Sequence, residues 1–122
     1  MCKIYLVIKR RTLYMTEIRL TINDNDKTVE AQMGDSIVIE LPENPTTGYR
    51  WTFDVKEGAG MAYLADSRYA VATGSGIGGG GMRTFIIKIQ SSGIATIDMK
   101  LRQQWEPESE AIDRFKAVIK SQ

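Results

Sequence analysis

Hydrophobic residues recur at every second position in six segments of this chain, and that alternation limits its possible folds more than any other feature. Successive side chains of a β-strand point to opposite faces, so each segment offers one apolar face to a core and one polar face to water. The triplets are Ile18/Leu20/Ile22, Ile37/Ile39/Leu41, Trp51/Phe53/Val55, Phe85/Ile87/Ile89, Ile97/Met99/Leu101 and Phe115/Ala117/Ile119. Turn-forming residues separate most of these runs, which predicts an all-β, antiparallel sandwich of seven to eight strands.

The alternation begins only after Met15. We therefore expect residues 1–14 to be an N-terminal extension outside the core, adding a strand only if it meets a partner edge, and residues 15–122 to form one domain. Residues 58–65 are the one weak helical candidate, and Trp51 with Phe53 is expected at the aromatic centre of the core. The apolar run at residues 4–8 is shorter than the roughly 7–15 residues of a signal-peptide core, so the expected location is cytoplasmic unless a leader was removed.

The composition argues against most enzymes. The chain has no histidine, which excludes Ser-His and Cys-His catalysis and histidine metal sites. Its one cysteine, Cys2, has no disulfide partner and no base to activate it. The acidic residues near turns are better explained as solvated side chains than as metal ligands; they are Asp24, Asp26, Glu106, Glu108 and Glu110. We expect no metal and no cofactor.

The charge balance and hydropathy argue against two further classes of partner. Sixteen basic and fifteen acidic residues leave a net charge of +1, so no broad basic face indicates nucleic acid binding. No apolar segment approaches the roughly 20 residues that a membrane-spanning helix needs.

The segment Asn44-Pro45-Thr46-Thr47-Gly48 contains more than a hairpin turn requires. Pro45 fixes φ, and Gly48 permits a backbone conformation that other residues avoid. Local chemistry alone favours a turn in which the threonine hydroxyls bond the backbone. The alternative is a stiff loop that presents Thr46 and Thr47 to a partner.

Residues 74–81 are rich in glycine and include a literal GxGxxG at Gly74, Gly76 and Gly79. A dinucleotide site needs a helix after this motif, whereas the continuation from Thr84 has the composition of a strand, which argues against nucleotide binding. No Gly-Lys-Ser/Thr sequence follows, so a P-loop is excluded. The segment is either a flexible hairpin tip or a bare backbone that lies against another chain.

A third segment, Gln103-Gln104-Trp105, follows a predicted strand and precedes a charged turn. An exposed tryptophan is a favoured interface anchor. The alternative is that Trp105 folds back over the edge of the sandwich.

Together the three segments resemble the chagasin/amoebiasin family of cysteine-peptidase inhibitors. Residues 44–51 match that family's NPTTG-aromatic-x-W signature without a gap, and Arg114-Phe115 resembles the R-F of its last strand. Gln103 and Gln104 stand where the family has Arg and Pro before its tryptophan. The glycines that fall at the family's GxGG loop are Gly78, Gly79, Gly80 and Gly81.

The resemblance implies an immunoglobulin-like sandwich that acts as a monomer and inhibits papain-like cysteine peptidases reversibly. Its three loops would enter the active-site cleft as a wedge, with residues 44–48 near the catalytic Cys and His, residues 78–81 on the non-primed side and Trp105 on the primed side. The chief alternative is an immunoglobulin-like binding or adhesion module with a different partner. A histidine-free enzyme acting through carboxylates is a third, weaker reading.

Overall fold

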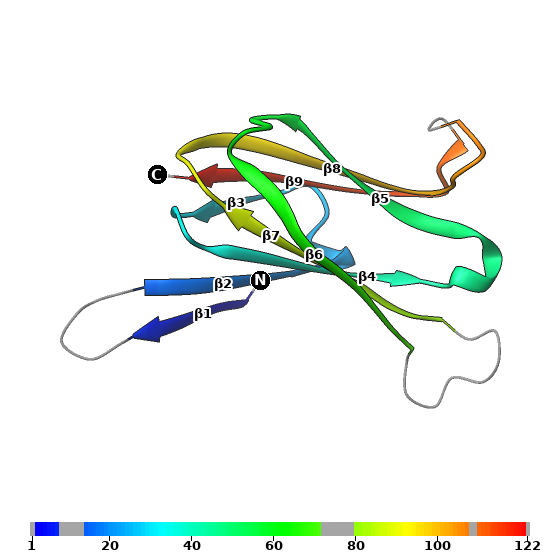
Figure 1. Ribbon diagram of the computed structural model, residues 1–122, viewed down its shortest axis with the longest axis horizontal. Helices are drawn as coiled ribbons and strands as arrows, with labels where there is room; N and C mark the ends of the chain where they lie inside the picture. The colour runs from blue at the N-terminus through cyan, green and yellow to red at the C-terminus, as the bar shows by residue number, and fades with distance from the viewer. Residues whose placement is uncertain (1, 8–13, 72–79, 108–109, 122) are drawn as a thin grey trace.

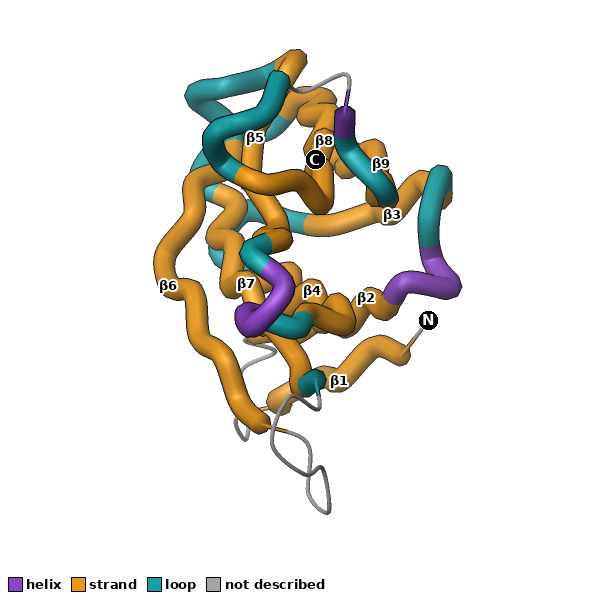
Figure 2. The backbone as a smooth tube through the Cα atoms, turned by 90° about the vertical axis from the view of Figure 1, so that its right-hand side faces the viewer, coloured by secondary structure: helices purple, strands orange, loops and turns teal. Residues whose placement is uncertain are grey.

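The computed structural model describes residues 2–7, 14–71, 80–107 and 110–121, which form two β-sheets packed face to face (Figure 1, Figure 2). The five-stranded sheet has the order β1-β2-β4-β7-β6, and the four-stranded sheet has the order β3-β9-β8-β5. The strands are β1 Cys2–Val7, β2 Tyr14–Thr21, β3 Lys27–Ala31, β4 Ser36–Glu43, β5 Tyr49–Glu57, β6 Ala62–Val71, β7 Gly81–Ile89, β8 Gly93–Gln103 and β9 Asp113–Ser121. The predicted immunoglobulin-like sandwich is confirmed, with eight strands apart from β1. No helix in these ranges is both long and apolar enough to span a membrane.

The alternating residues supply the core between the sheets, as the sequence predicts. Phe115 has no exposed surface, and Trp51 is 5% exposed. Phe53 is only partly buried and stacks on Phe85, with ring centroids 6.4 Å apart. Burying one large apolar side chain stabilises a fold by about 1.5–3 kcal/mol, so the core rests on many such residues. Trp51 therefore lies in the core as expected, while Phe53 lies at its margin.

The chain crosses from one sheet to the other at the 3-10 helix η1 (Ile22–Asp24) and reverses direction there, so β3 runs opposite to β2 (Figure 1). The chain reverses again between β3 and β4, so β2 pairs in parallel with β4. β3 pairs in parallel with β9, whereas the other strand pairs are antiparallel. The buried carboxylate of Asp24 fixes the crossing by accepting hydrogen bonds from the Thr21 N–H and from Lys27 Nζ, both at 2.8 Å. Burial raises the pKa of Asp24, but the hydrogen bonds from Lys27 and Thr21 and the charge of Lys27 outweigh it and hold the pKa below its usual value.

The N-terminal segment contributes a strand to the first sheet. Residues of β1 pair antiparallel with β2, from Cys2 opposite Arg19 to Val7 opposite Tyr14. The boundary that separates residues 1–14 from the domain stays a prediction.

The helix suggested at residues 58–65 is wrong. A turn closed by the Met61 N–H and the Gly58 carbonyl (2.9 Å) leads directly into β6. β5 and β6 are the outer strands of their sheets, and each contains a break in register, between Val55 and Glu57 and between Leu64 and Asp66. Both open edges on this side of the sandwich are therefore bulged.

The strand ends that flank three of the connections lie at one end of the sandwich, on the right of Figure 1. The three connections join β4 to β5, β6 to β7 and β8 to β9. These are the connections that contain the three segments singled out in the sequence.

Candidate functional site

The structure brings the described parts of the three predicted segments together. Residues 44–48 connect β4 to β5, and Gly80 leads into β7, which begins at Gly81. Gln103 ends β8, and Gln104 and Trp105 lie in the turn after it. Gly81 lies opposite Glu43 in the register of β4 and β7, beside the first loop. Gly78 and Gly79 lie outside the described residues.

The first loop is a 3-10 turn, η2 (Pro45–Thr47), held by its own hydrogen bonds. Asn44 Oδ1 accepts from the Thr46 N–H (3.1 Å) and from the Thr46 hydroxyl (2.7 Å). The Thr47 hydroxyl donates to the Asn44 carbonyl (2.7 Å), and the Gly48 N–H donates to the Pro45 carbonyl (3.1 Å). Gly48 ends the turn at φ +81°, in the left-handed region where glycine carries no penalty. The local-chemistry prediction of hydroxyls bonding the backbone is confirmed for Thr47, whereas the Thr46 hydroxyl bonds the Asn44 side chain. Both threonine side chains remain exposed.

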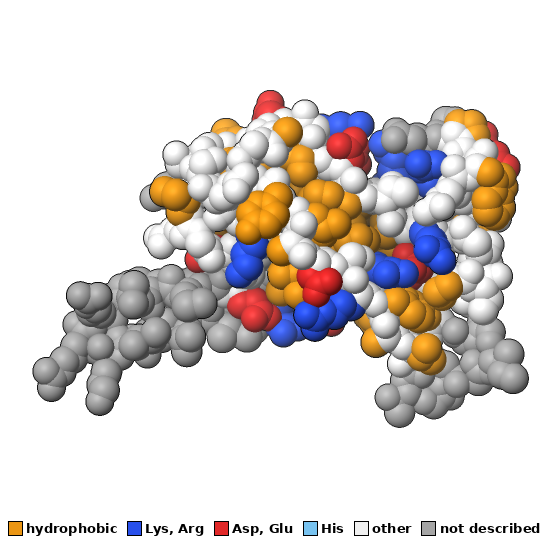
Figure 3. Space-filling view, in the orientation of Figure 1, with side chains coloured by type: hydrophobic (Ala, Val, Ile, Leu, Met, Phe, Trp, Pro, Cys, Tyr) orange, Lys and Arg blue, Asp and Glu red, His pale blue; other side chains and the backbone are white. Residues whose placement is uncertain are grey.

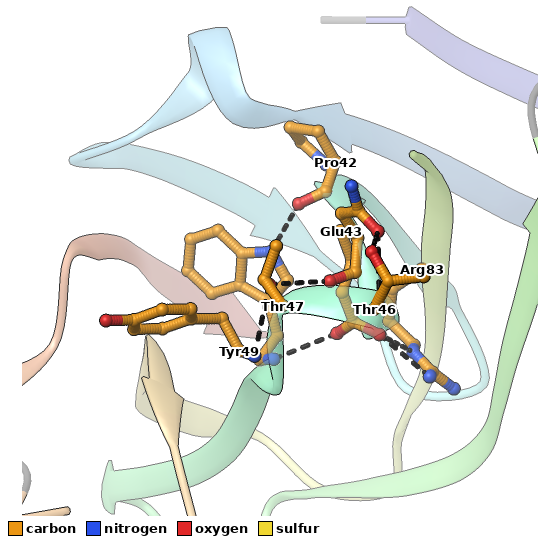
Figure 4. Close-up of polar contacts among 8 residues, drawn as sticks. Pro42, Glu43, Thr46, Thr47, Tyr49 and Arg83 are labelled. Atoms are coloured by element: carbon orange, nitrogen blue, oxygen red, sulfur yellow. Dashed lines mark hydrogen bonds and ion pairs between the residues drawn. The ribbon is translucent and has the colours of Figure 1, made fainter. Parts of the chain in front are cut away.

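The base of this loop is fastened by a buried carboxylate that the sequence analysis missed. The Glu43 side chain has no exposed surface, and its Oε2 accepts from the Trp51 N–H (2.9 Å) (Figure 4). Its Oε1 accepts from Arg83 Nε (3.1 Å) and Nη2 (2.8 Å), so the pair is bidentate on the arginine side. Trp51 Nε1 in turn donates to the Pro42 carbonyl (2.8 Å). Strands β4, β5 and β7 are thus joined directly beneath the loop.

The start of β7 has no room for a side chain. A Cβ on Gly81 would lie 2.1 Å from the Ala70 carbonyl oxygen and 2.7 Å from Tyr69 Oη. The Tyr69 ring also receives the Arg83 guanidinium, whose Cζ lies 5.3 Å from the ring centroid. The glycine at position 81 is therefore required by the packing of this protein itself.

The third segment contacts the first loop. Gln103 Nε2 donates to the Thr47 carbonyl (3.3 Å), and a Cβ on Gly48 would lie 3.0 Å from Cη2 of Trp105. Trp105 is nevertheless 71% exposed. It therefore does not fold back into the sandwich.

Exposed apolar side chains gather around these loops (Figure 3). Besides Trp105 they are Val71, Met82 and Ile112. Met82 and Ile112 also line a groove of about 710 Å³ that runs beneath the first loop, together with Pro42 and Leu101. These apolar side chains beside ordered loops make this end of the sandwich the candidate binding surface. Among the described residues no cluster of three or more His, Cys, Asp or Glu side chains is suited to hold a metal ion.

Residues 30–119 match the model of the chagasin family of peptidase inhibitors. The chain belongs to this family. Its chagasin-family relatives include chagasin of Trypanosoma cruzi, 26% identical over 106 residues that cover 84% of this chain and 96% of chagasin. Amoebiasin-1 of Entamoeba histolytica is 33% identical over 90 residues, covering 72% of this chain and 84% of the relative.

The fold of the family is also seen in a solved structure, that of the cysteine protease inhibitor EhICP2 from Entamoeba histolytica. It superimposes with a TM-score of 0.78 at 21% identity, covering 87% of this chain and 96% of that protein. At this identity the likeness concerns the fold alone.

Proposed function

We propose that this chagasin-family protein inhibits papain-like cysteine peptidases reversibly by inserting the three-loop end of its sandwich into the active-site cleft. The observation that carries the proposal is the pre-formed first loop, which has Gly81 beside its base and Trp105 beside its end. A loop that is already ordered has little conformational entropy left to lose on binding. Its neighbours supply exposed apolar surface on either side.

The hydrogen bonding of the first loop explains why a peptidase would bind it without cleaving it. Cleavage requires an extended segment whose carbonyl enters the oxyanion hole. The carbonyls of Asn44, Pro45 and Thr47 already accept hydrogen bonds inside the inhibitor, within a tight turn. Extending the turn into the conformation that a peptidase cleaves would require breaking those bonds.

The same contacts define how the threonines would meet the enzyme. The Thr46 hydroxyl proton is donated to Asn44 Oδ1, which leaves Thr46 Oγ1 as a hydrogen-bond acceptor. A cleft that displays N–H or O–H donors beside its nucleophile is complementary to such a surface. Trp105 then supplies an aromatic anchor next to the loop.

The test is titration of active-site-titrated papain and of a cathepsin L-like peptidase with the purified protein. We expect stoichiometric inhibition that is reversed on dilution, with trypsin and a metallopeptidase unaffected. Papain whose cleft has been blocked covalently should no longer be captured by the immobilised protein. Absence of inhibition at micromolar protein, or equal capture of blocked and free papain, would overturn the proposal.

A further inference from the structure

Trp105 is a large exposed side chain at the tip of a turn, and such a side chain costs free energy to order when it binds. The turn is closed by the Glu106 N–H, which donates to the Gln103 carbonyl (3.0 Å). Where the family resemblance leads one to expect a proline before the tryptophan, this chain has Gln104. Some other group must therefore limit the motion of the turn if Trp105 is to serve as an anchor.

Arg102 is placed to do this. Its Nη1 donates to the Glu106 carbonyl (2.9 Å) and to the Gln104 carbonyl (3.3 Å). These two carbonyls belong to the residues immediately before and after Trp105. A single guanidinium nitrogen thus contacts the backbone on both sides of the tryptophan, and the planar head group of arginine is held in this position with less loss of freedom than the flexible ammonium of lysine would be.

The fold by itself gives no reason for a cation at this position. Arg102 lies directly opposite Arg50 in the register of β5 and β8, and like charges facing each other across a strand pair are destabilising. A neutral side chain would avoid that repulsion. The hydrogen bonds from Arg102 to the turn offset the repulsion between Arg102 and Arg50.

We propose that Arg102 is a positioning residue that holds Trp105 in its outward orientation, supplying the stiffness that a proline would otherwise give to this loop. The proposal rests on the proposed function for its effect on inhibition. The orientation of Trp105 in the free protein is testable without any peptidase.

The first measurement is the heteronuclear NOE of the Trp105 indole N–H, with its cross-peak assigned from Trp105→Phe. The only other indole is that of Trp51, which is hydrogen-bonded in the core and serves as an internal reference. We expect Arg102→Met to lower the NOE of Trp105 and to leave that of Trp51 unchanged, and Arg102→Lys to give an intermediate value. Arg50→Met is the matched control, because it removes a charge from the same strand pair and, within the described ranges, no hydrogen bond or ion pair of its guanidinium is present.

The second measurement is a double-mutant cycle of inhibition constants for papain. We expect Arg102→Met to weaken inhibition about 2- to 10-fold, the effect of having to order one more large side chain on binding. In a Trp105→Ala background the same substitution should have no effect, because the residue that Arg102 positions is gone. Arg50→Met should be additive with Trp105→Ala.

Two results would overturn the inference. One is an unchanged Trp105 NOE in a folded Arg102→Met protein. The other is an equal loss of inhibition from Arg102→Met with and without Trp105, which would mean that Arg102 contacts the peptidase itself. If the wild-type protein does not inhibit papain at all, the proposed function fails, and the NOE comparison still decides whether Arg102 orders Trp105.

Discussion

Nη2 of Arg83 lies 2.8 Å from Oε1 of Glu43, and this largely buried ion pair joins the strand that enters the first loop to the strand that follows the glycine segment. Because Glu43 Oε2 also accepts the Trp51 N–H, the pair fixes both ends of the first loop. Two of the three loops therefore share one rigid base.

Removing the Glu43 carboxylate should destabilise the fold strongly. Glu43→Ala leaves the Arg83 guanidinium and the Trp51 N–H without their acceptor, and loss of one partner of a buried pair costs about 3–5 kcal/mol. The control is Glu40→Ala on the same strand, because the Glu40–Arg19 pair is exposed and should contribute at most about 1 kcal/mol. Urea unfolding of both variants measures the difference, and equal losses would contradict the role given to Glu43.

Gly81→Ala should destabilise the protein because a Cβ there would meet the Ala70 carbonyl at 2.1 Å. Backbone cannot move aside cheaply, and overpacking of this kind costs about 1–3 kcal/mol or more. Gly60→Ala is the matched control, since nothing lies within 4 Å of a Cβ at that turn position. Thermal denaturation should show a lower Tm for Gly81→Ala only.

Gly48→Ala should raise the inhibition constant by more than its loss of folding stability alone would explain. The substitution places a side chain at φ +81° and 3.0 Å from the Trp105 ring, so it both strains the turn and displaces the anchor. Gly34→Ala has the same kind of strain, at φ +91°, with nothing within 4 Å. Each should lose about 1–2 kcal/mol of stability, the usual cost of a left-handed residue. Inhibition constants should rise for Gly48→Ala alone, and a similar rise in Gly34→Ala would show that strain rather than Trp105 is responsible.

Thr46 should matter more for inhibition than Trp105. Thr46→Glu puts a bulky charge at the tip of the loop that enters the cleft, whereas Trp105→Ala removes an anchor beside it at a cost of about 1–3 kcal/mol. Inhibition constants against one papain-like enzyme decide the order. Abolition of inhibition by Trp105→Ala, with Thr46→Glu silent, would mean that the loop roles are assigned wrongly.

Asp24 should make the stability of the fold depend on pH in the acid range. Its folded-state pKa lies below the unfolded value of about 3.9, so its contribution is present above that pH and is lost as the pH falls through the folded-state pKa. The difference in unfolding free energy between wild type and Asp24→Asn should therefore be greatest near neutral pH and shrink below pH about 3.9. Guanidinium titrations at several pH values measure it, and a difference independent of pH would refute the assignment.

The strands with one buried face could be predicted from the sequence, because burial imposes alternation on them. β6 could not, since as an outer strand it is exposed over most of its length and only Ala62 is buried. With little to bury, its sequence shows no period. For the same reason residues 58–65, which include the start of β6, look like a weak helical candidate in the sequence.

The loop residues could be predicted because their motif is continuous in sequence. The residues that hold these loops in place, Glu43, Arg83 and Arg102, could not be predicted. Glu43 and Arg83 are 40 residues apart, and Arg102 acts on backbone carbonyls that any residue possesses, so neither leaves a local pattern. What sequence alone could have suggested is only that an acid precedes the motif and an arginine follows the glycines.

The register breaks in β5 and β6 affect whether copies of the protein can pair with one another at high concentration. An inhibitor that acts one molecule per enzyme must be present at no less than the concentration of its target. An uninterrupted outer strand at such concentrations would offer its unpaired N–H and C=O groups to the next copy. Extra residues at positions 56 and 65 interrupt that row on both sheets. The bulged outer strands β5 and β6 are therefore poorly suited to pair with a second copy of the protein, which leaves the loops as the surface that binds.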